Sequence, residues 1–420
     1  VDDEYSSSGS YGEPDTELSN ENFSFSTGRT ESQEFTVDLA PMFSQHGIPT
    51  DLVKNKPFAL EIDENEYSFE QFNSTTTPTI PFRVEPIECV IINVAHLEQF
   101  PKPCSQYSAK LPSIYAWFDA QTAFSSEYIP TVQLYFKTCY NKIRAHLRFF
   151  FSIAPSNERM QNLSSVRREV PAGRILFHYI GYGFPTITEK NIWSSEKRST
   201  DFQPFDLGQL FSRLKPPTWF IFDCSNAAAV IPTFIETAKK QPNISGIDWN
   251  DWFCICATDA GEELPSDPRI PRDFLTSCVL SSVKMAVVCH ILQHYRVNLV
   301  SGKFPLDQSA HYLLSDKSPE AKKLSLALTA ITDAIAADSL SPDLYHKIFR
   351  CDRLSAVLFR HFLLAQFLLR PYKVHPKSHP DLPDLSMHKL WHHWSIMIDT
   401  AICAVQVPRP SFASDLFTRL

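Results

Sequence analysis

Two short apolar runs of the sequence each end in residue types that could carry out nucleophilic chemistry. The first run, residues 174–179, contains His178 and continues into a Gly-Tyr-Gly turn around Tyr182 and Gly183. The second run begins at Thr218 and ends in four consecutive candidate residues, Asp223, Cys224, Ser225 and Asn226. A thiol or hydroxyl nucleophile needs a nearby base, most often an imidazole. Because parallel strands place their carboxyl ends at one edge of a sheet, the two turns predict a nucleophile and base site.

His178 is nevertheless predicted to pack inside the sheet rather than to activate Cys224. It lies within its apolar run, four residues before Tyr182 and so below the level of the turn. Ser225 would need a base at its own level, where the first turn offers Tyr182. A phenol with a reference pKa of about 10 is a poor base at neutral pH. The favoured interpretation is a rigid turn without chemistry, and the alternative is a cysteine peptidase that uses Cys224.

Two pairs of histidines and one acidic turn are the other candidate ligand sites. His290 and His294, and separately His388 and His392, have the spacing of four that can bind zinc from one helix face. Neither pair has the His-Glu-x-x-His pattern, and no third ligand lies beside it in the sequence. No metal or cofactor is therefore expected. The acidic turn at residues 259–263 could hold a cation or a basic peptide, or be a solvated loop.

Apolar runs rich in Val, Ile and Phe predict the strands of a sheet. The predicted strands are residues 89–97, 113–118, 147–153, 174–179, 218–224 and 251–258. Helical spacing between them predicts helices at 128–143, 156–168, 206–214 and 226–240, with Asn226 as the cap of the last. Strands that alternate with helices of this length indicate an α/β fold with a mostly parallel sheet and right-handed crossovers.

The pattern changes after residue 271 to helices alone. Apolar spacing of three and four predicts helices at 281–295, 319–337, 342–369 and 385–404. Four prolines between residues 371 and 383 interrupt the last two, because proline cannot continue a helix. The expected organisation has four parts: a disordered acidic arm at 1–35, an extended segment at 36–84, an α/β domain at 85–275 and a helical extension at 276–420.

Charge and cysteine usage narrow the classes of partner and compartment. The arm contains nine Asp and Glu residues and one Arg, which accounts for the whole net charge of −8 and leaves residues 36–420 balanced. No basic stripe indicates a nucleic-acid partner. The ten cysteines are scattered through apolar runs, which is typical of reduced thiols in the cytoplasm. No stretch approaches the roughly 20 apolar residues of a membrane span.

Several separated blocks of the sequence resemble the Raptor family, a subunit of the target-of-rapamycin (TOR) kinase complex. They include RILFHYIGYGFPTIT, PPTWFIFDCSNAA, CATDAGEELP and SMHKLWHHW, in the same order along residues 85–405. The resemblance implies a caspase-like fold, a three-layer sandwich around a mostly parallel sheet that is followed by an α-helical region. It also implies a scaffold that recruits substrate proteins to the TOR kinase.

The same resemblance assigns roles to the two turns. Caspase-like peptidases place the catalytic histidine in a Gly-His-Gly turn, where this sequence has Tyr182, and the catalytic cysteine at the position of Ser225. Cys224 lies one residue too early and is expected to point to the other side of its strand. Both members of the catalytic dyad are thus expected to be replaced, and the chain is expected to be a degenerate, non-catalytic relative of the peptidases.

Overall fold

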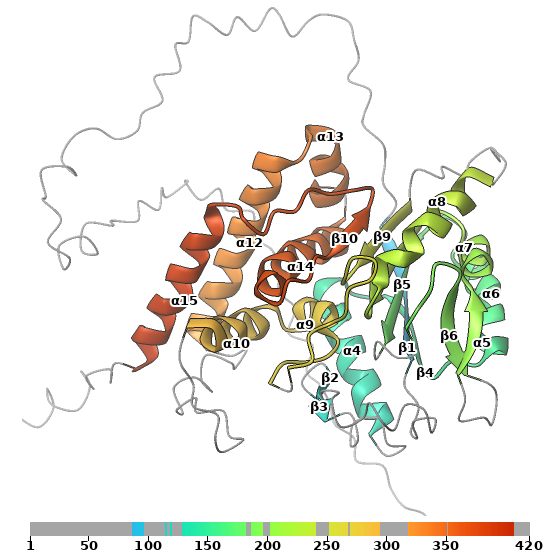
Figure 1. The fold of residues 1–420 in the computed structure, drawn as a ribbon, viewed down its shortest axis with the longest axis horizontal. Helices are drawn as coiled ribbons and strands as arrows, with labels where there is room; N and C mark the ends of the chain where they lie inside the picture. Colours follow the sequence, from blue (N-terminus) through green and yellow to red (C-terminus); the bar gives the residue numbers. More distant parts are fainter. Residues whose placement is uncertain are drawn as a thin grey trace, which may run out of the picture. The chain divides into compact units, whose positions relative to one another are not determined.

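The computed structural model describes ten stretches of the chain, all within the compact unit Pro78–Leu420. They are residues 86–95, 114–115, 118–119, 128–181, 186–195, 202–240, 252–267, 269–294, 318–350 and 352–406. The predicted arm and extended segment lie outside these residues, and so do Tyr182 and Gly183. Figure 1 shows the described elements as coloured ribbons.

A six-stranded sheet forms the centre of this unit, in the order β10-β9-β8-β5-β1-β4. Its strands are β1 (Ile87–Ala95), β4 (Arg148–Ile153), β5 (Arg174–Gly181), β8 (Thr218–Asp223), β9 (Trp252–Cys256) and β10 (Lys377–His379). The first five are parallel and β10 is antiparallel to β9. The predicted α/β fold with a mostly parallel sheet is therefore confirmed.

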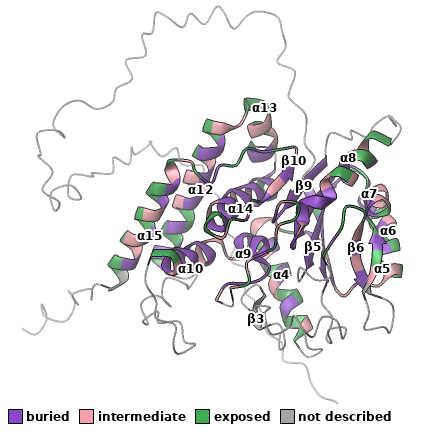
Figure 2. Cartoon of the chain, viewed as in Figure 1, coloured by how far each residue is buried: buried purple, intermediate pink, exposed green. Residues whose placement is uncertain are grey.

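Side chains of the central strands enter two separate hydrophobic cores, one on each face of the sheet. On β8, Phe220 and Phe222 belong to one core, together with Phe211 of helix α7 (Leu207–Leu214). Trp219 and Ile221 belong to the other, where the ring centre of Phe359 in helix α14 (Arg353–Leu369) lies 5.4 Å from that of Trp219. We call these the α7-side core and the α14-side core. Burial on both faces explains why the strands read as continuous apolar runs, and Figure 2 shows them buried along most of their length.

Helices cover both faces and make the sandwich three-layered. The α7-side core is covered by α5 (Asn157–Gln161), α6 (Leu163–Glu169), α7 (Leu207–Leu214) and α8 (Ile231–Lys240). The α14-side core is covered by α4 (Ile129–Ile143), α9 (Phe274–Leu280), α10 (Ser282–His294), α12 (Pro319–Ser339), α14 (Arg353–Leu369) and α15 (Leu390–Gln406).

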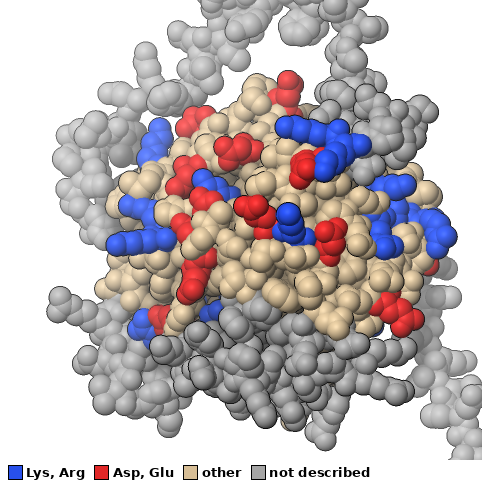
Figure 3. Space-filling view, turned by 45° about the vertical axis from the view of Figure 1, so that its right-hand side comes forward, with Lys and Arg blue, Asp and Glu red and all other residues tan. Residues whose placement is uncertain are grey.

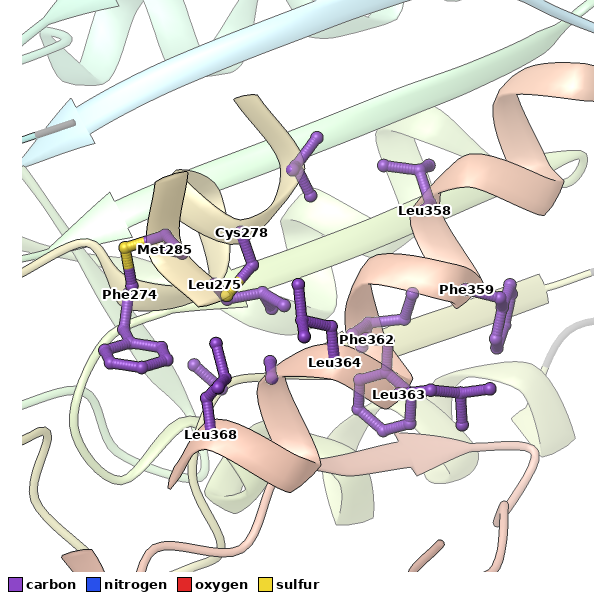
Figure 4. Close-up of a cluster of buried hydrophobic side chains, with 14 of the residues drawn as sticks. Phe274, Leu275, Cys278, Met285, Leu358, Phe359, Phe362, Leu363, Leu364 and Leu368 are labelled. Carbon is purple, nitrogen blue, oxygen red and sulfur yellow. The ribbon is translucent and has the colours of Figure 1, made fainter. Parts of the chain in front are cut away.

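The helices after residue 275 share the α14-side core with the sheet. Figure 4 shows the centre of this contact, where Leu275 and Cys278 of α9 face Phe362 and Leu364 of α14. The same cluster of buried residues continues into the strands, through Val90 of β1 and other inward-facing side chains. The helical region and the sheet are therefore held together by one continuous apolar interior.

Three strands form where no strand was predicted. β10 lies in the region for which only helices were predicted; it is three residues long and precedes Pro380, so no apolar run marks it. The stretch around Trp193, between the strand predicted at 174–179 and the helix predicted at 206–214, contains a hairpin of β6 (Asn191–Ser195) and β7 (Phe202–Asp206). These predictions were wrong because short or polar strands carry a weak period, and their pairing depends on distant parts of the chain.

Three predicted elements are interrupted in the structure. The helix predicted at 342–369 is divided into α13 (Pro342–Tyr345), the π-helix η5 (His346–Arg350) and α14. The Asp352 carboxylate accepts a hydrogen bond from the Ser355 amide at 2.9 Å and so caps the start of α14. The helix predicted at 156–168 divides at Asn162 into α5 and α6. Within the run at 113–118, the described residues lie in two-residue strands, β2 (Ile114–Tyr115) and β3 (Phe118–Asp119), which pair antiparallel.

Truncation of a core residue in α14 tests whether the helical layer stabilises the sheet. Phe362 is fully buried, so Phe362→Ala is expected to lower the free energy of unfolding by about 3–5 kcal/mol, through lost burial and the cavity left behind. Leu326 on α12 is 74% exposed, and Leu326→Ala is expected to change the free energy of unfolding by less than about 0.5 kcal/mol. Chemical denaturation followed by tryptophan fluorescence measures both. Equal effects would contradict the shared core.

Candidate functional site

His178 is buried in the α14-side half of the structure, below the carboxyl edge of the sheet. It is fully inaccessible, and burial lowers the pKa of its imidazole to about 3. Its Nδ1 lies 2.9 Å from the hydroxyl of Tyr140 on α4, and its Nε2 lies 2.8 Å from Oγ1 of Thr276 on α9. Both ring nitrogens are therefore engaged by other helices and neither faces Cys224.

Asp223 extends this buried chain of hydrogen bonds to the end of β8. Its Oδ2 accepts from the Thr276 amide at 2.6 Å, and the Thr276 hydroxyl also donates to this carboxylate. Thr276 therefore contacts both groups, because its hydroxyl also lies 2.8 Å from Nε2 of His178. Burial raises the pKa of Asp223 to about 6, although the hydrogen bonds from Thr276 lower it. The network fixes α4 and α9 against the strands.

Cys224 faces the opposite side of the sheet from His178. It is 1% exposed and belongs to the α7-side core, whereas His178 contacts Tyr140 and Thr276 on the α14 side. Burial, followed by the nearby Asp223 carboxylate, raises the pKa of the Cys224 thiol well above its usual range. A buried thiol on the far face of the sheet from the imidazole forms no catalytic dyad with it.

Ser225 binds the turn that follows β9. Its hydroxyl oxygen accepts a hydrogen bond from the Leu264 amide at 3.0 Å, and the residue is 2% exposed. The neighbouring Thr258 supports the same region, since its hydroxyl donates to the Cys224 carbonyl oxygen at 3.1 Å and accepts from the Ala227 amide at 2.8 Å. The position that could have carried a nucleophile is therefore occupied by a buried structural hydroxyl.

Asn226 joins two loops instead of capping a helix with its side chain. It has left-handed backbone angles, φ 58° and ψ 30°, and its side chain makes no cap hydrogen bond to the following 3-10 helix, Ala227–Val230. Its Nδ2 donates to the Ile187 carbonyl at 2.8 Å, and its Oδ1 accepts from the Gly261 amide at 2.7 Å. The predicted side-chain cap was wrong because asparagine tolerates left-handed angles, and its amide can bridge two backbone segments.

The acidic turn is occupied by side chains of the same chain. Glu262 Oε1 lies 2.6 Å from Nδ1 of His375, and Glu262 Oε2 accepts from the His375 amide at 2.8 Å. Burial raises the pKa of Glu262, but these hydrogen bonds outweigh it and the net shift is downward. Asp259 lies 3.6 Å from the ammonium of Lys377 on β10. The basic ligand suggested by the sequence is thus supplied by the segment that leads into the sixth strand.

Comparison with known proteins places this arrangement in a family. Residues 85–234 match the model of the Raptor N-terminal caspase-like domain. They belong to that family. The chain is 30% identical over 323 residues to the target of rapamycin complex 1 subunit mip1 of Schizosaccharomyces pombe, covering 73% of this chain and 24% of the relative. It is 29% identical to regulatory-associated protein of TOR 1 of Arabidopsis thaliana, over 70% of this chain and 22% of the relative.

A solved Raptor structure shows the same fold. The crystal structure of Chaetomium thermophilum Raptor matches 78% of this chain and 29% of its own chain, with a TM-score of 0.67 and 29% sequence identity. The chain spans about a quarter of the length of the curated relatives named above. The caspase-like domain and the helices that follow it are therefore the part of Raptor that this chain shares.

The paired histidines of the helical layer contact carboxylates. His290 Nε2 lies 2.6 Å from an oxygen of Asp399, and His388 Nε2 lies 3.1 Å from one of Asp338. Among the described residues, no group of three His, Cys, Asp or Glu side chains is arranged to hold a metal ion. Nor does that part of the chain contain a helix of the length and apolarity needed to cross a membrane.

The buried network predicts a specific change in the pH dependence of stability. His178 has a folded pKa of about 3 against an ordinary value of 6.5, so the unfolded chain binds the extra proton between these values and stability falls on acidification. Asp223 has a folded pKa of about 6 against an ordinary value of 3.8. Between these values the folded chain binds the extra proton, so the contribution of Asp223 to stability rises on acidification. Between about pH 6 and 4 the two effects oppose each other.

Asp223→Asn removes one of these opposing effects and keeps an acceptor for Thr276. The free energy of unfolding of the variant is expected to fall more steeply than that of the parent chain between pH 6 and 4, by up to about 1.4 kcal/mol per pH unit. Urea denaturation at a series of pH values measures the two slopes. Equal slopes for the variant and the parent chain would contradict the raised pKa of the Asp223 carboxyl.

Proposed function

We propose that the chain is a non-catalytic scaffold of a TOR kinase complex that recruits substrate proteins to the kinase. The carrying observation is the match of this chain to subunits of TOR complex 1, combined with the burial of Cys224 on the sheet face opposite His178. The fold is that of a peptidase domain, but the described residues around the second turn form structural hydrogen bonds.

The replacement of both dyad positions supports the degenerate, pseudoenzyme part of this proposal. Ser225 stands where the resemblance places the catalytic cysteine, and Tyr182 stands where it places the histidine. The alternative, a cysteine peptidase that uses Cys224, would require the thiol to leave the α7-side core. The scatter of the ten cysteines through apolar runs of the sequence supports a place for the chain in the cytoplasm.

A groove of about 340 Å³ between α10, α14 and α15 supports substrate docking. Its cationic lining residues are Arg370 and Lys389, accompanied by three histidines, and it contains no Asp or Glu. Phe367 and Trp391 stack at its wall with ring centres 4.6 Å apart. A peptide with an apolar anchor and neighbouring carboxylates fits this combination of aromatic wall and positive rim. We assign the recruitment of acidic, hydrophobic substrate motifs to this groove.

A two-ligand capture experiment tests the scaffold role. The immobilised chain is expected to retain purified TOR kinase and, separately, a fluorescent peptide that contains one Phe followed by alternating acidic residues. Arg370 and Lys389 are exposed, so Arg370→Glu with Lys389→Glu should leave the fold intact and weaken peptide binding at least about tenfold.

The matched control reverses two exposed lysines on α12, Lys322→Glu with Lys323→Glu, and should change peptide binding less than about twofold. Retention of the kinase should be unchanged in both variants. Failure to retain the kinase would contradict the scaffold role, and equal loss of peptide in the two variants would contradict the assignment of the groove.

A further inference from the structure

Two basic segments that are far apart in the sequence meet at the edge of the sheet where the parallel strands begin. Residues 142–148 lead from the end of α4 into β4, and residues 346–353 lead from η5 into α14. An ion pair between Arg144 Nη1 and Asp352 Oδ1, at 3.0 Å, joins them. We call this surface the basic edge. It lies at the opposite end of the strands from Ser225.

The basic edge concentrates positive charge in a chain whose residues 36–420 together carry no net charge. By contrast, the face drawn in Figure 3 shows side chains of both signs. Its six cations are Lys142, Arg144, Arg148, Lys347, Arg350 and Arg353. The two segments contain one acid, Asp352, which is 5% exposed and already paired with Arg144. A further carboxylate at the rim, Glu169, lies 3.5 Å from Arg148, and both side chains are more than half exposed. The surface therefore keeps a net positive charge, although Lys347 is half-buried with its ammonium 5.3 Å from the ring centre of Phe253.

The folding of α14 does not account for Arg353, which is the first residue of that helix. The amino end of a helix carries partial positive charge, so cations placed there are electrostatically unfavourable. The Asp352 cap offsets only part of this repulsion. An anionic ligand would remove the rest. Basic residues at the carboxyl end of a helix need no such explanation, as with Lys142 on α4 and with Lys347 and Arg350 in the last turn of η5.

The chemistry of the surface indicates the kind of anion. Four of its six cations are arginines, and a planar guanidinium group can donate two parallel hydrogen bonds to one carboxylate. The large hydrophobic side chains that are exposed among the described residues all lie outside the two segments. A membrane-binding surface would combine its cations with exposed apolar groups. We propose that the basic edge docks an acidic peptide segment of a partner protein, held by charge without an apolar anchor, at a site separate from the groove beside α15.

A charge-reversal experiment on the full chain tests this site. The probe is a fluorescent peptide of ten glutamates, followed by anisotropy at low ionic strength, where exposed charges are weakly screened. Arg350 and Arg353 are exposed, and Arg350→Glu with Arg353→Glu is expected to weaken binding at least about tenfold. The neutral pair Arg350→Gln with Arg353→Gln should give an intermediate loss.

Two controls decide the specificity of the result. Lys322→Glu with Lys323→Glu on α12 makes the same change in net charge at another exposed surface and should weaken binding less than about twofold. Equal loss in this control would overturn the proposal, because binding would then follow net charge alone. Vesicles that contain phosphatidylserine form the second probe. Binding of vesicles but not of the glutamate peptide, lost on reversal of Arg350 and Arg353, would also overturn it in favour of a membrane surface.

Discussion

The alternation of side chains along β8 is the constraint on which the rest of the site depends. Asp223 faces α9 while Cys224, one residue later, faces the α7-side core. His178 on β5 shares the side of Asp223, where Thr276 joins the two through hydrogen bonds. Because successive residues of a strand point to opposite faces, the thiol and the imidazole are separated by the sheet itself.

Side-chain hydrogen bonds at the carboxyl edge of the sheet join the residues after β8 to the turn after β9. Ser225 binds the amide of Leu264, and Asn226 binds that of Gly261, so both fix the turn after β9. Glu262 of that turn then binds His375, just before β10. A continuous series of hydrogen bonds thus joins the end of β8 to the sixth strand, and the buried hydroxyl of Ser225 is part of it.

Much of the fold could be predicted from the sequence, because the buried parallel strands are apolar on both faces. The runs at 174–179 and 218–224 gave β5 and β8 nearly to the residue. β10 could not be predicted, because its three residues have no pattern of their own and it forms only against β9. The hydrogen bond between Glu262 and His375 joins residues 113 apart in the chain, so no local sequence pattern could predict it.

The candidate site was predictable in its placement but not in its contacts. The spacing of His178 within its run indicated a packed ring, yet its partners Tyr140 and Thr276 come from helices at other positions in the chain. Asparagine is a common helix-capping residue, so the sequence predicted a cap at Asn226. Its side chain instead binds the backbone of Gly261 and Ile187, and these contacts depend on the tertiary structure. Sequence patterns therefore located the turns, while tertiary contacts decided their chemistry.

Thiol modification of the native chain is the most direct test of this account. Cys403 on α15 is exposed and Cys224 is buried, and burial raises the pKa of the Cys224 thiol. An electrophilic peptide probe, mapped by mass spectrometry, is expected to modify Cys403 at least about a hundredfold faster than Cys224 under native conditions. Rapid modification of Cys224 in the folded chain would contradict the account, because it would place a reactive thiol at the carboxyl edge of the sheet.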